Sequence, residues 1–498
     1  MRSILSYFGK HPHFLILSLI LLIGLFFRTY QMVERFEFAH DGDLYSWIVK
    51  DVVINHHFRL IGQLTSAPGI FIGGLFYYLL IPFFLLTKMD PIGAAYFTII
   101  IGLATIVSYY FVLTKLFKAE IGLIISFLYA TLLTTVNTDR WAVPTITTNL
   151  WVIWYFYTIV RITKGDYTVL PLLGILIGLI WHVHIALIPA LIAVPVAIIL
   201  SKKLPDIKQL IQFVIAFFIT SIPLFAFETR HGFEQTISLI NNFRTPAVGA
   251  KGLYKLTLVL NMIVKNINNL FLQPQSFSQP FNILLVLLIL LSAFLLVKKR
   301  LLSRKELIVF ASWITGVIIF FGVSSSPISE YYFSNIEIIF ITLVGLDLYL
   351  ILKSSLLGRI LVIGLLIFIP LKNGYFILTQ SYYHKGYAEK KEVVKYIKTD
   401  AGNNGFPCIG ISYITAAGEN VGFRYFFYLN NMHLVHPSTN VPVYNIVIPD
   451  ELSPGEVKQK FGHIGVIPPV KIPSKEIIER SCQTPDTNLT DSMFGYVE

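Results

Sequence analysis

The sequence predicts an all-α polytopic membrane bundle of about 11–13 transmembrane helices, together with a small C-terminal extracytoplasmic α/β domain. Composition is the first observation behind this prediction. Of the 498 residues, 55% are hydrophobic and 13% are charged, and the mean hydropathy of +0.68 lies outside the range of ordinary soluble domains. The grouping of the apolar residues is the second observation, because blocks of roughly 16–24 residues match the ~20 helical residues that cross a hydrocarbon core.

The apolar blocks define the individual helices. The first block follows a short basic stub with Arg2 and Lys10 and has no small-residue cleavage site after it, so we interpret it as a retained helix and not as a signal peptide. The candidate transmembrane blocks are 13–28, 69–87, 93–116, 121–136, 145–162, 168–183, 185–200, 209–226, 280–297, 306–323, 335–352 and 357–371.

Basic residues predict how the chain is oriented. The net charge of +11 comes largely from Lys and Arg in short loops between apolar blocks, which is typical of the positive-inside rule and not of a nucleic-acid-binding surface. We therefore expect a multi-pass protein of the plasma membrane with a cytoplasmic N-terminus, external loops 29–68 and 227–279, and an extracytoplasmic C-terminal domain. The residues that set this orientation are Lys202, Lys203, Lys298, Lys299, Arg300, Arg304, Lys305, Lys353 and Arg359.

This topology contains one conflict. Residues 29–68 and 137–144 are both expected outside the cytoplasm, yet three apolar blocks separate them, and three crossings would end on the opposite side. One block must therefore fail to cross. The shortest block, 121–136, is one candidate. If Lys115 and Lys118 are cytoplasmic, the block that fails to cross is instead 69–87. The three blocks are 69–87, 93–116 and 121–136.

The chain divides into two regions. Residues 1–375 form the predicted transmembrane domain, including both external loops. Residues 376–498 form the predicted α/β domain, because KKEVVKYIKTDAG is typical of an amphipathic helix, and PCIGISYI, FRYFFYLN and VYNIVIPD are typical of short strands. Both cysteines, Cys408 and Cys482, lie in this second region, where a disulfide and two separate buried thiols each fit the sequence.

The first external loop carries the sequence FEFAHDGDLYSWIVKDVVINHHFRLIG (36–62), whose apolar residues recur at nearly helical spacing. A helix with this pattern would lie along the membrane interface, with Asp41 and Asp43 at its start. Acids are favourable at a helix N-terminus, so N-capping accounts for one of them. Capping does not account for both, and we therefore expect a chemical role for at least one.

With these features the chain resembles the GT-C membrane glycosyltransferases. These include the protein O-mannosyltransferases, the aminoarabinose transferases of lipid A and the bacterial enzymes of lipopolysaccharide core galacturonosyl transfer. In layout, the resemblance covers roughly residues 10–375. Its specific part consists of three short motifs, which are HDGDLYSWIVKD (40–51), RLIGQLTSAPGIFIGGLFYYLLIPF (59–83) and DRWAVPT (139–145).

The resemblance implies an inverting glycosyltransferase that moves a sugar from a polyprenyl-phosphate-linked donor to an extracytoplasmic protein, lipid or cell-envelope glycan. The family's first-loop catalytic acid corresponds to Asp41, with Asp43 as the second candidate. Many relatives carry Asp-Glu where this chain has Asp-Gly-Asp, and His-Pro-Pro or Lys-Pro-Pro where it has Ser66, Ala67 and Pro68. These departures leave the donor sugar, the acceptor and the choice between the two acids open.

A phosphate leaving group needs nearby cations to stabilise its developing charge. Arg140 lies in the DRWAVPT motif on the same predicted side as Asp41, where an interfacial anchor beside Trp141 is its alternative role. His182 and His184 occupy a corner between two apolar blocks and could contact the donor phosphate or a metal. The predicted donor-binding residues are Arg59, Arg140, His182, His184, Arg230 and Arg244, and Lys251 and Lys255 are further external cations.

A divalent cation, Mg²⁺ or Mn²⁺, is a candidate cofactor, because some GT-C enzymes use a metal and others do not. If a metal binds, Asp41, Asp43 and His40 are its predicted ligands. Carboxylate and imidazole groups together suit divalent cations.

Two other functions also fit parts of the sequence. A secondary transporter would need acids near the middle of spans, and apart from Glu306 at the first position of block 306–323, only Glu337 and Asp347 lie within predicted spans. An O-antigen polymerase or ligase would place its key residues in a large late external loop, for which 227–279 is the candidate. Within that loop, segment 241–271 is either a lid over a lipid-donor groove or an interfacial connector.

Overall fold

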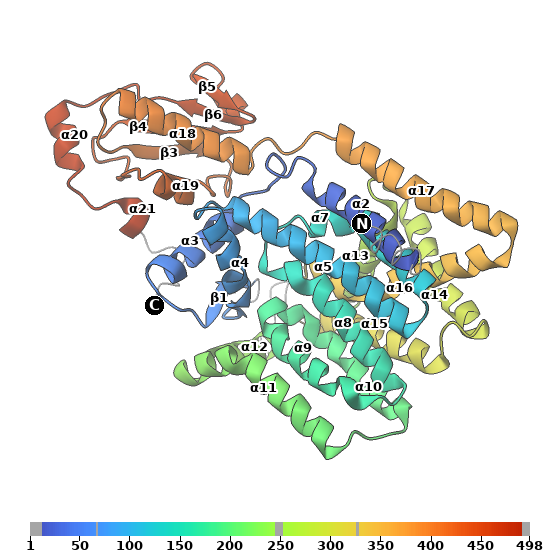
Figure 1. Ribbon diagram of the computed structural model, residues 1–498. Helices are drawn as coiled ribbons and strands as arrows, with labels where there is room; N and C mark the ends of the chain where they lie inside the picture. Colours follow the sequence, from blue (N-terminus) through green and yellow to red (C-terminus); the bar gives the residue numbers. More distant parts are fainter. Residues whose placement is uncertain (1–11, 66–67, 245–251, 325–327, 491–498) are drawn as a thin grey trace, which may run out of the picture.

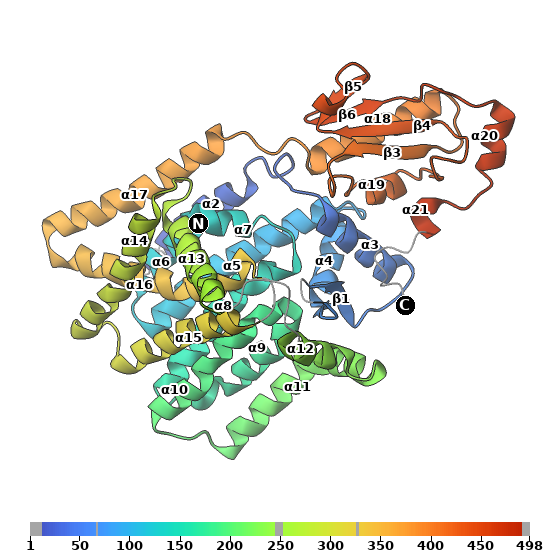
Figure 2. The ribbon, with the colours of Figure 1, turned by 180° about the vertical axis from the view of Figure 1, so that it is seen from behind.

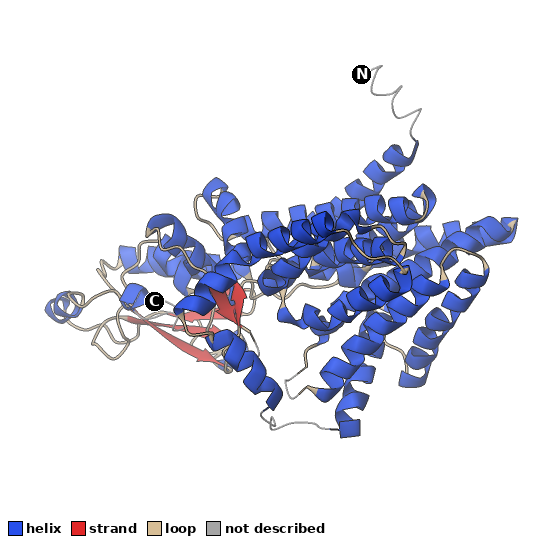
Figure 3. Cartoon of the chain, turned by 90° about the horizontal axis from the view of Figure 1, so that it is seen from below, coloured by secondary structure: helices blue, strands red, loops and turns tan. Residues whose placement is uncertain are grey.

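The computed structural model describes residues 12–65, 68–244, 252–324 and 328–490. Most of these residues are helical, and the strands lie together at one end of the molecule (Figure 3). A helical bundle makes up most of the chain, and a small sheet-containing domain is attached to one end of it (Figure 1). The predicted fold class, a polytopic helical bundle with a C-terminal α/β domain, is confirmed.

Seven described helices are long and apolar enough to cross a membrane. Four further stretches of about 17–20 residues are broken helices that follow predicted blocks, namely α6–α7, η1–α8, η2–α9 and η3–α10. The long helices are α2 (Pro12–Thr29), α5 (Ile92–Leu116), α11 (Ile207–Arg230), α14 (Gln279–Lys298), α15 (Arg304–Val323), α16 (Ser334–Ser354) and α17 (Leu356–Thr379). The broken ones are α6 (Ala119–Thr131) with α7 (Leu133–Thr138), η1 (Pro144–Thr147) with α8 (Thr148–Thr163), η2 (Tyr167–Val169) with α9 (Leu170–Val183), and η3 (Ile185–Ile192) with α10 (Ala193–Ser201).

Close helix contacts and a few buried polar pairs hold the bundle together. Gly345 of α16 faces α6 so closely that an added Cβ would come within 2.2 Å of Ile125, which is how small residues bring membrane helices together. The end of α2 is fixed by a fully buried ion pair, in which Arg28 Nη2 lies 2.6 Å from Asp139 Oδ2. Tyr129 donates to the other oxygen of Asp139 at 2.8 Å. A buried charge pair of this kind is stable only because its remaining lone pairs are also satisfied.

The C-terminal domain places a four-stranded sheet, in the order β3-β4-β6-β5, against α18 (Figures 1 and 2). Strands β3 and β4 are parallel and the other pairs are antiparallel. Cys408 and Cys482 form a disulfide. The elements are α18 (Tyr387–Asn403), β3 (Gly410–Thr415), α19 (Arg424–Leu429), β4 (Val443–Ile448), η5 (Asp450–Leu452), β5 (Gln459–Phe461), β6 (Ile464–Ile467), α20 (Lys475–Ser481) and α21 (Thr487–Thr490).

One strand prediction is wrong, because FRYFFYLN forms helix α19. Its aromatic residues favour a strand by local propensity. In the folded domain Tyr425, Phe426 and Phe427 are all buried, so the short helix is covered on several sides. Tertiary packing therefore overrides the local preference.

The first external loop and the C-terminal domain share one hydrophobic core. The loop contains α3 (His40–Ile54) and β1 (Ile61–Leu64), and β2 (Phe71–Gly73) and α4 (Leu75–Leu86) follow directly after it. Phe36, Phe38 and Tyr45 from the loop region belong to the same buried cluster as Phe426 and Tyr444 from the domain. The ring centroids of Phe38 and Phe426 are 4.9 Å apart. The two regions proposed from sequence are therefore separate along the chain but share a core.

Helix α4 decides which block fails to cross. Its 12 residues span only about 18 Å, which is too short for a hydrocarbon core. Asp90, just beyond its C-terminal end, accepts hydrogen bonds from Tyr387 and Lys391 of the C-terminal domain, each at 2.6 Å. We call the face of the bundle that carries this domain the outer face, and the opposite face the inner face. Both ends of α4 lie on the outer face, so 69–87 is the block that does not cross.

We predict that a cysteine in place of Lys88 reacts from outside the cell. Lys88 follows α4 and is exposed, whereas the exposed Lys115 lies at the far end of α5. In intact cells, a membrane-impermeant maleimide should label Lys88→Cys and should label Lys115→Cys only after permeabilisation. The native cysteines are paired with each other and should not react. The reverse labelling pattern would mean that α4 crosses the membrane.

Candidate active site

Helix α3 carries three acids, and the structure gives each a different environment. Asp41, in the first turn, is half-buried and accepts a hydrogen bond from Gln63 Nε2 on β1 at 3.2 Å. Gln63 is itself held by Tyr77 of α4, whose hydroxyl accepts from the Gln63 N–H at 3.0 Å and donates to Gln63 Oε1 at 3.2 Å. Asp41 makes no ion pair with any residue that the structure describes. A hydrogen bond therefore fixes the position of this carboxylate, and no cation of the described residues is paired with it.

Asp43 faces the C-terminal domain. Its side chain is buried, and its Oδ1 accepts the backbone N–H of Tyr425 in α19 at 2.9 Å. Burial raises the pKa of Asp43 to about 6, although the Tyr425 N–H and the charges of Arg424 and Lys390 oppose that rise. Asp43 therefore joins α3 to the domain.

Asp51, near the end of α3, binds the predicted donor-binding residue Arg59. Arg59 Nη2 lies 2.8 Å from Asp51 Oδ2, and His57 Nδ1 lies 3.2 Å from the same oxygen. Burial by itself would raise the pKa of Asp51, but Arg59, Asn55 and His57 together lower it. Arg59 thus closes the turn between α3 and β1.

The predicted metal-ligand set of Asp41, Asp43 and His40 does not converge within the described part of the chain. Residues two apart on a helix point in different directions, and the side chains of Asp41 and Asp43 accordingly contact different elements. The two carboxylates therefore face different neighbours, and a metal site on Asp41, Asp43 and His40 stays a prediction.

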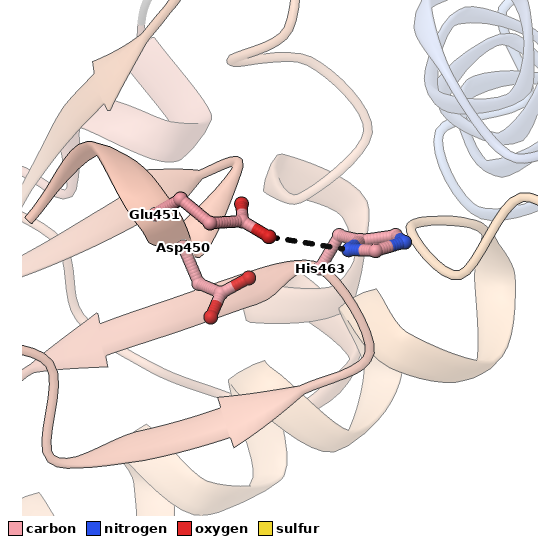
Figure 4. Close-up of side chains that lie close together, drawn as sticks. All are labelled: Asp450, Glu451 and His463. Carbon is pink, nitrogen blue, oxygen red and sulfur yellow. Dashed lines mark ion pairs between the residues drawn. The ribbon is translucent and has the colours of Figure 1, made fainter. Parts of the chain in front are cut away.

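The acid and histidine group that does converge lies in the C-terminal domain. Asp450 and Glu451 of η5 meet His463 of the β5–β6 turn, with their ligand atoms within 4.8 Å of one another (Figure 4). Asp450 Oδ2 is bound by Lys460 Nζ at 2.6 Å, however. This ammonium group already supplies the positive charge that a metal would bring.

A polar cavity of about 350 Å³ opens among the outer ends of the helices. Glu337, in the first turn of α16, is 8% exposed, and its carboxylate makes no hydrogen bond or ion pair with a described residue. Trp141 forms one wall and is 44% exposed. The cavity is lined by Thr134, Thr138, Trp141, Thr145, Thr148, Asn149, Asn266, Asn269, Gln273, Glu330, Tyr331, Ser334 and Glu337. Hydroxyl, amide, carboxylate and aromatic groups of this kind can bind the hydroxyls and the apolar face of a sugar ring.

Asp41 is not part of this lining, but the segment after α7 connects the two sites. Trp141 and Thr145 of this segment face the cavity. Ala142 and Ile146 pack in the same cluster as Tyr45 of α3. One side of this segment therefore borders the cavity, and the other side belongs to the hydrophobic cluster that includes α3.

Arg140 lines a second cavity, of about 400 Å³, which also has Trp141 in its wall. Its guanidinium donates to the carbonyls of Phe27 at 3.1 Å and Tyr30 at 2.8 Å. Burial, together with the nearby charges of Arg35 and Arg28, lowers the pKa of Arg140 to about 10. Arg35 lines the same cavity and donates to carbonyls near the end of α17. Neither arginine forms an ion pair with a carboxylate of the described residues, and the cavity lining holds these two cations and one acid, Glu37.

The two predicted histidines have different surroundings. His182 packs against Gly73 of β2 and lies within hydrogen-bond distance of the Leu75 N–H at 3.4 Å and the Thr220 carbonyl at 3.3 Å. It therefore joins the first loop to α9 and α11. His184 accepts the Ala186 N–H at 3.0 Å and packs among Tyr331 and Tyr332, and burial lowers its pKa to about 4. His184 is neutral at neutral pH and lies behind the wall of the polar cavity.

The second external loop forms two helices, α12 (Glu234–Arg244) and α13 (Gly252–Leu272). Helix α13 lies across the outer ends of other helices, where Lys255 contacts the Ser324 carbonyl and Lys265 pairs with Glu330 at 2.6 Å. Arg230, at the end of α11, is exposed. Lys251 and the side chain of Arg244 lie outside the described residues. Asn266 and Asn269 on α13 line the polar cavity, so this helix covers it.

The overall architecture matches known membrane enzymes. ArnT from Cupriavidus metallidurans, crystallised with undecaprenyl phosphate, aligns over 91% of this chain and 97% of its own, with a TM-score of 0.55 and 10% identity. Its apo form aligns over 92% and 98%, with a TM-score of 0.54 and 10% identity. An Archaeoglobus fulgidus oligosaccharyltransferase, crystallised with Zn and sulfate, covers 87% of this chain and 68% of its own, with a TM-score of 0.51 and 12% identity.

The chain has the GT-C fold. The similarity to GT-C enzymes expected from the sequence is thereby confirmed, and it extends through most of the chain. No protein-family model matches the sequence, and a comparison with curated protein sequences also gives no match. At 10–12% sequence identity, the match to GT-C structures establishes the architecture of the chain as a multi-pass membrane protein. The chemistry has to be argued from the side chains.

Sequence reasoning did not identify Glu337 or Arg35 as site residues. Glu337 was noticeable as an acid inside an apolar block, which is costly and often functional. Its position at the outer end of α16 shows that it faces a cavity and not the middle of the membrane. Arg35 had no sequence signal, because its relation to Arg140 depends on how α17 packs beside the end of α2.

We predict that Asp43 makes the stability of the protein depend on pH. Because its pKa is about 6 in the folded protein and 3.8 ordinarily, the folded state binds the proton more tightly. The stabilising contribution of this group is therefore full below about pH 4 and declines by roughly 3 kcal/mol as the pH rises through 6. Asp43→Asn should reduce the difference between melting temperatures measured near pH 4.5 and pH 7.5 in detergent. An undiminished difference would show that Asp43 does not titrate in this way.

Proposed function

We propose that this protein is an inverting glycosyltransferase that transfers a sugar from a polyprenyl-phosphate-linked donor to an acceptor outside the cytoplasm. Asp41 is the general base that takes the proton of the acceptor nucleophile. The observation that carries the proposal is the state of Asp41, which is held by Gln63 on the outer face of a GT-C fold and paired with no cation of the described residues. The acceptor is a protein, a lipid or a cell-envelope glycan.

The chemistry requires a carboxylate in this state. Glycosyl transfer passes through an oxocarbenium-like state, and an acceptor hydroxyl is a weak nucleophile until a base removes its proton. Direct attack opposite the phosphate inverts the anomeric carbon and needs no covalent enzyme intermediate. The acceptor oxygen forms the new bond, polyprenyl phosphate leaves with the electron pair, and Asp41 takes the proton. Asp51 is less suited to this role because Arg59 and His57 already stabilise its charge.

The two outer cavities fit the two parts of the donor. In our proposal, the polar cavity beneath α13 holds the sugar, with Glu337 accepting hydrogen bonds from its hydroxyls and Trp141 packing on the ring. The phosphate lies in the adjacent cavity, where Arg35 and Arg140 stabilise the charge that develops as the bond breaks. Trp141 borders both cavities, which is where the bond between sugar and phosphate would lie.

The proposed compartment agrees with the chemistry of the C-terminal domain. Its disulfide is stable in an oxidising environment such as the bacterial periplasm or the cell exterior. We therefore assign the outer face to the extracytoplasmic side and the N-terminus to the cytoplasm. No step of the proposed reaction requires a metal. ArnT was crystallised with undecaprenyl phosphate, a lipid of the class that the proposed reaction releases, and the archaeal enzyme with Zn and sulfate.

We predict that Asp41→Asn lowers the rate of transfer by roughly 10²–10⁴-fold while the protein still folds and inserts. The measurement is release of free polyprenyl phosphate by purified protein from a panel of radiolabelled polyprenyl-phosphate sugars. Asp43→Asn should keep most of the activity, and Glu34→Gln, an exposed acid before α3, serves as the matched control. Glu337→Gln should lower kcat/KM by roughly 10–100-fold through the loss of charged hydrogen bonds. Full activity in Asp41→Asn would refute the assignment of the base.

A further inference from the structure

A cavity of about 610 Å³ lies at the inner face, away from the C-terminal domain and the proposed reaction. We call it the basic cavity. Its lining comes largely from three turns, between α5 and α6, between α8 and α9, and between α14 and α15. Its lining residues are Leu116, Phe117, Lys118, Ile121, Lys164, Val297, Arg300, Leu301, Leu302, Ser303, Arg304 and Glu306.

The charges in the basic cavity are unbalanced. Four cations, Lys118, Lys164, Arg300 and Arg304, face a single acid, Glu306. Glu306 is already bound twice, since its Oε2 accepts the Ser303 N–H at 2.7 Å and its Oε1 lies 3.1 Å from Lys164 Nζ. Lys118 donates to the Tyr349 hydroxyl at 3.4 Å and lies over that ring.

Arg300 and Arg304 are the cations that stay available. Both are exposed, and neither forms an ion pair with a residue in the described part of the chain. Arg300 lies in the turn between α14 and α15, and Arg304 is the first residue of α15, directly after the N-cap Ser303. Two guanidinium groups at one opening can bind the oxygens of a single phosphate in a forked geometry that Lys does not provide.

The other wall of the basic cavity is apolar. Phe117, Ile121 and Leu301 lie beside the two arginines, and Val297 continues this wall onto α14. The neighbouring surface of α14 is apolar and exposed at Leu291 (59%), Phe294 (65%) and Leu295 (45%), as expected of a lipid-facing helix. The positive-inside rule accounts for basic residues in these turns. It does not account for their convergence on one cavity that has an apolar wall leading to the lipid-facing side.

We propose that the basic cavity binds the phosphodiester of an anionic phospholipid from the inner leaflet. Arg300 and Arg304 bind the phosphate oxygens, and the first carbons of an acyl chain lie along Phe117 and Leu301. Basic pockets between membrane helices on this side of a bilayer suit anionic head groups. The site is independent of sugar transfer and holds whether or not Asp41 acts as the base.

The test is native mass spectrometry of the full-length protein in detergent with added phosphatidylglycerol or phosphatidylcholine. The wild type should retain phosphatidylglycerol over phosphatidylcholine. The double variant Arg300→Gln/Arg304→Gln should lose this binding by roughly tenfold or more. The control Lys202→Gln/Lys208→Gln removes two exposed charges from another turn of the inner face and should bind like the wild type. Arg300→Lys/Arg304→Lys keeps the positive charges but loses the forked geometry of the guanidinium groups. Its affinity for phosphatidylglycerol should lie between those of the wild type and the Gln double variant.

Two results would overturn the proposal. Equal phosphatidylglycerol binding by the Gln variant and the control, whether both lose it or both keep it, would mean that surface charge and not the cavity binds the lipid. Inorganic phosphate or glycerol phosphate that competes at the same concentration as phosphatidylglycerol would mean that the cavity takes a soluble phosphate. A melting curve for each variant shows that the protein is folded before its lipid is measured.

Discussion

The packing of the first external loop against the C-terminal domain is the interaction on which the outer half of this molecule depends. The loop region contributes Phe36, Phe38 and Tyr45 to a core that the domain completes with Phe426 and other aromatic residues. A loop of this length has too little apolar surface to fix its own helices, because ordering each residue costs about 1–2 kcal/mol of conformational entropy. Lys390, buried in the domain, donates a hydrogen bond to the Phe38 carbonyl at 2.6 Å. This backbone oxygen just before α3 therefore has a partner from the domain.

This arrangement explains why α3 carries two acids so close together. Asp43 attaches α3 to the C-terminal domain, because its carboxylate accepts the Tyr425 N–H and lies near the charges of Arg424 and Lys390. Asp41, two residues earlier, points away from that contact and toward Gln63. One acid therefore fixes the helix and the other is presented by it, and a proposed base needs this kind of support from packed neighbours.

Much of this arrangement could be predicted from the sequence, and the failures have identifiable causes. Helix positions followed from apolar blocks, because the bilayer imposes a length on each crossing. The role of 69–87 did not follow, because the contacts of Asp90 with Tyr387 and Lys391 join residues about 300 positions apart in the sequence. The strand expected at FRYFFYLN became a helix through packing. Asp41 could be proposed from its motif. Glu337 and Arg35 could not, because the cavities that they line are formed by helices far apart in sequence.

The central claim is that the C-terminal domain holds α3 in place, and hydrogen–deuterium exchange tests it most directly. Phe426→Ala removes a domain side chain that packs on Phe38, without touching the loop itself. If the two regions fold as one unit, amides of residues 40–54 should exchange at least about tenfold faster in this variant, since such a truncation costs roughly 3–5 kcal/mol. Faster exchange confined to residues 387–490, with α3 as protected as in the wild type, would contradict the account.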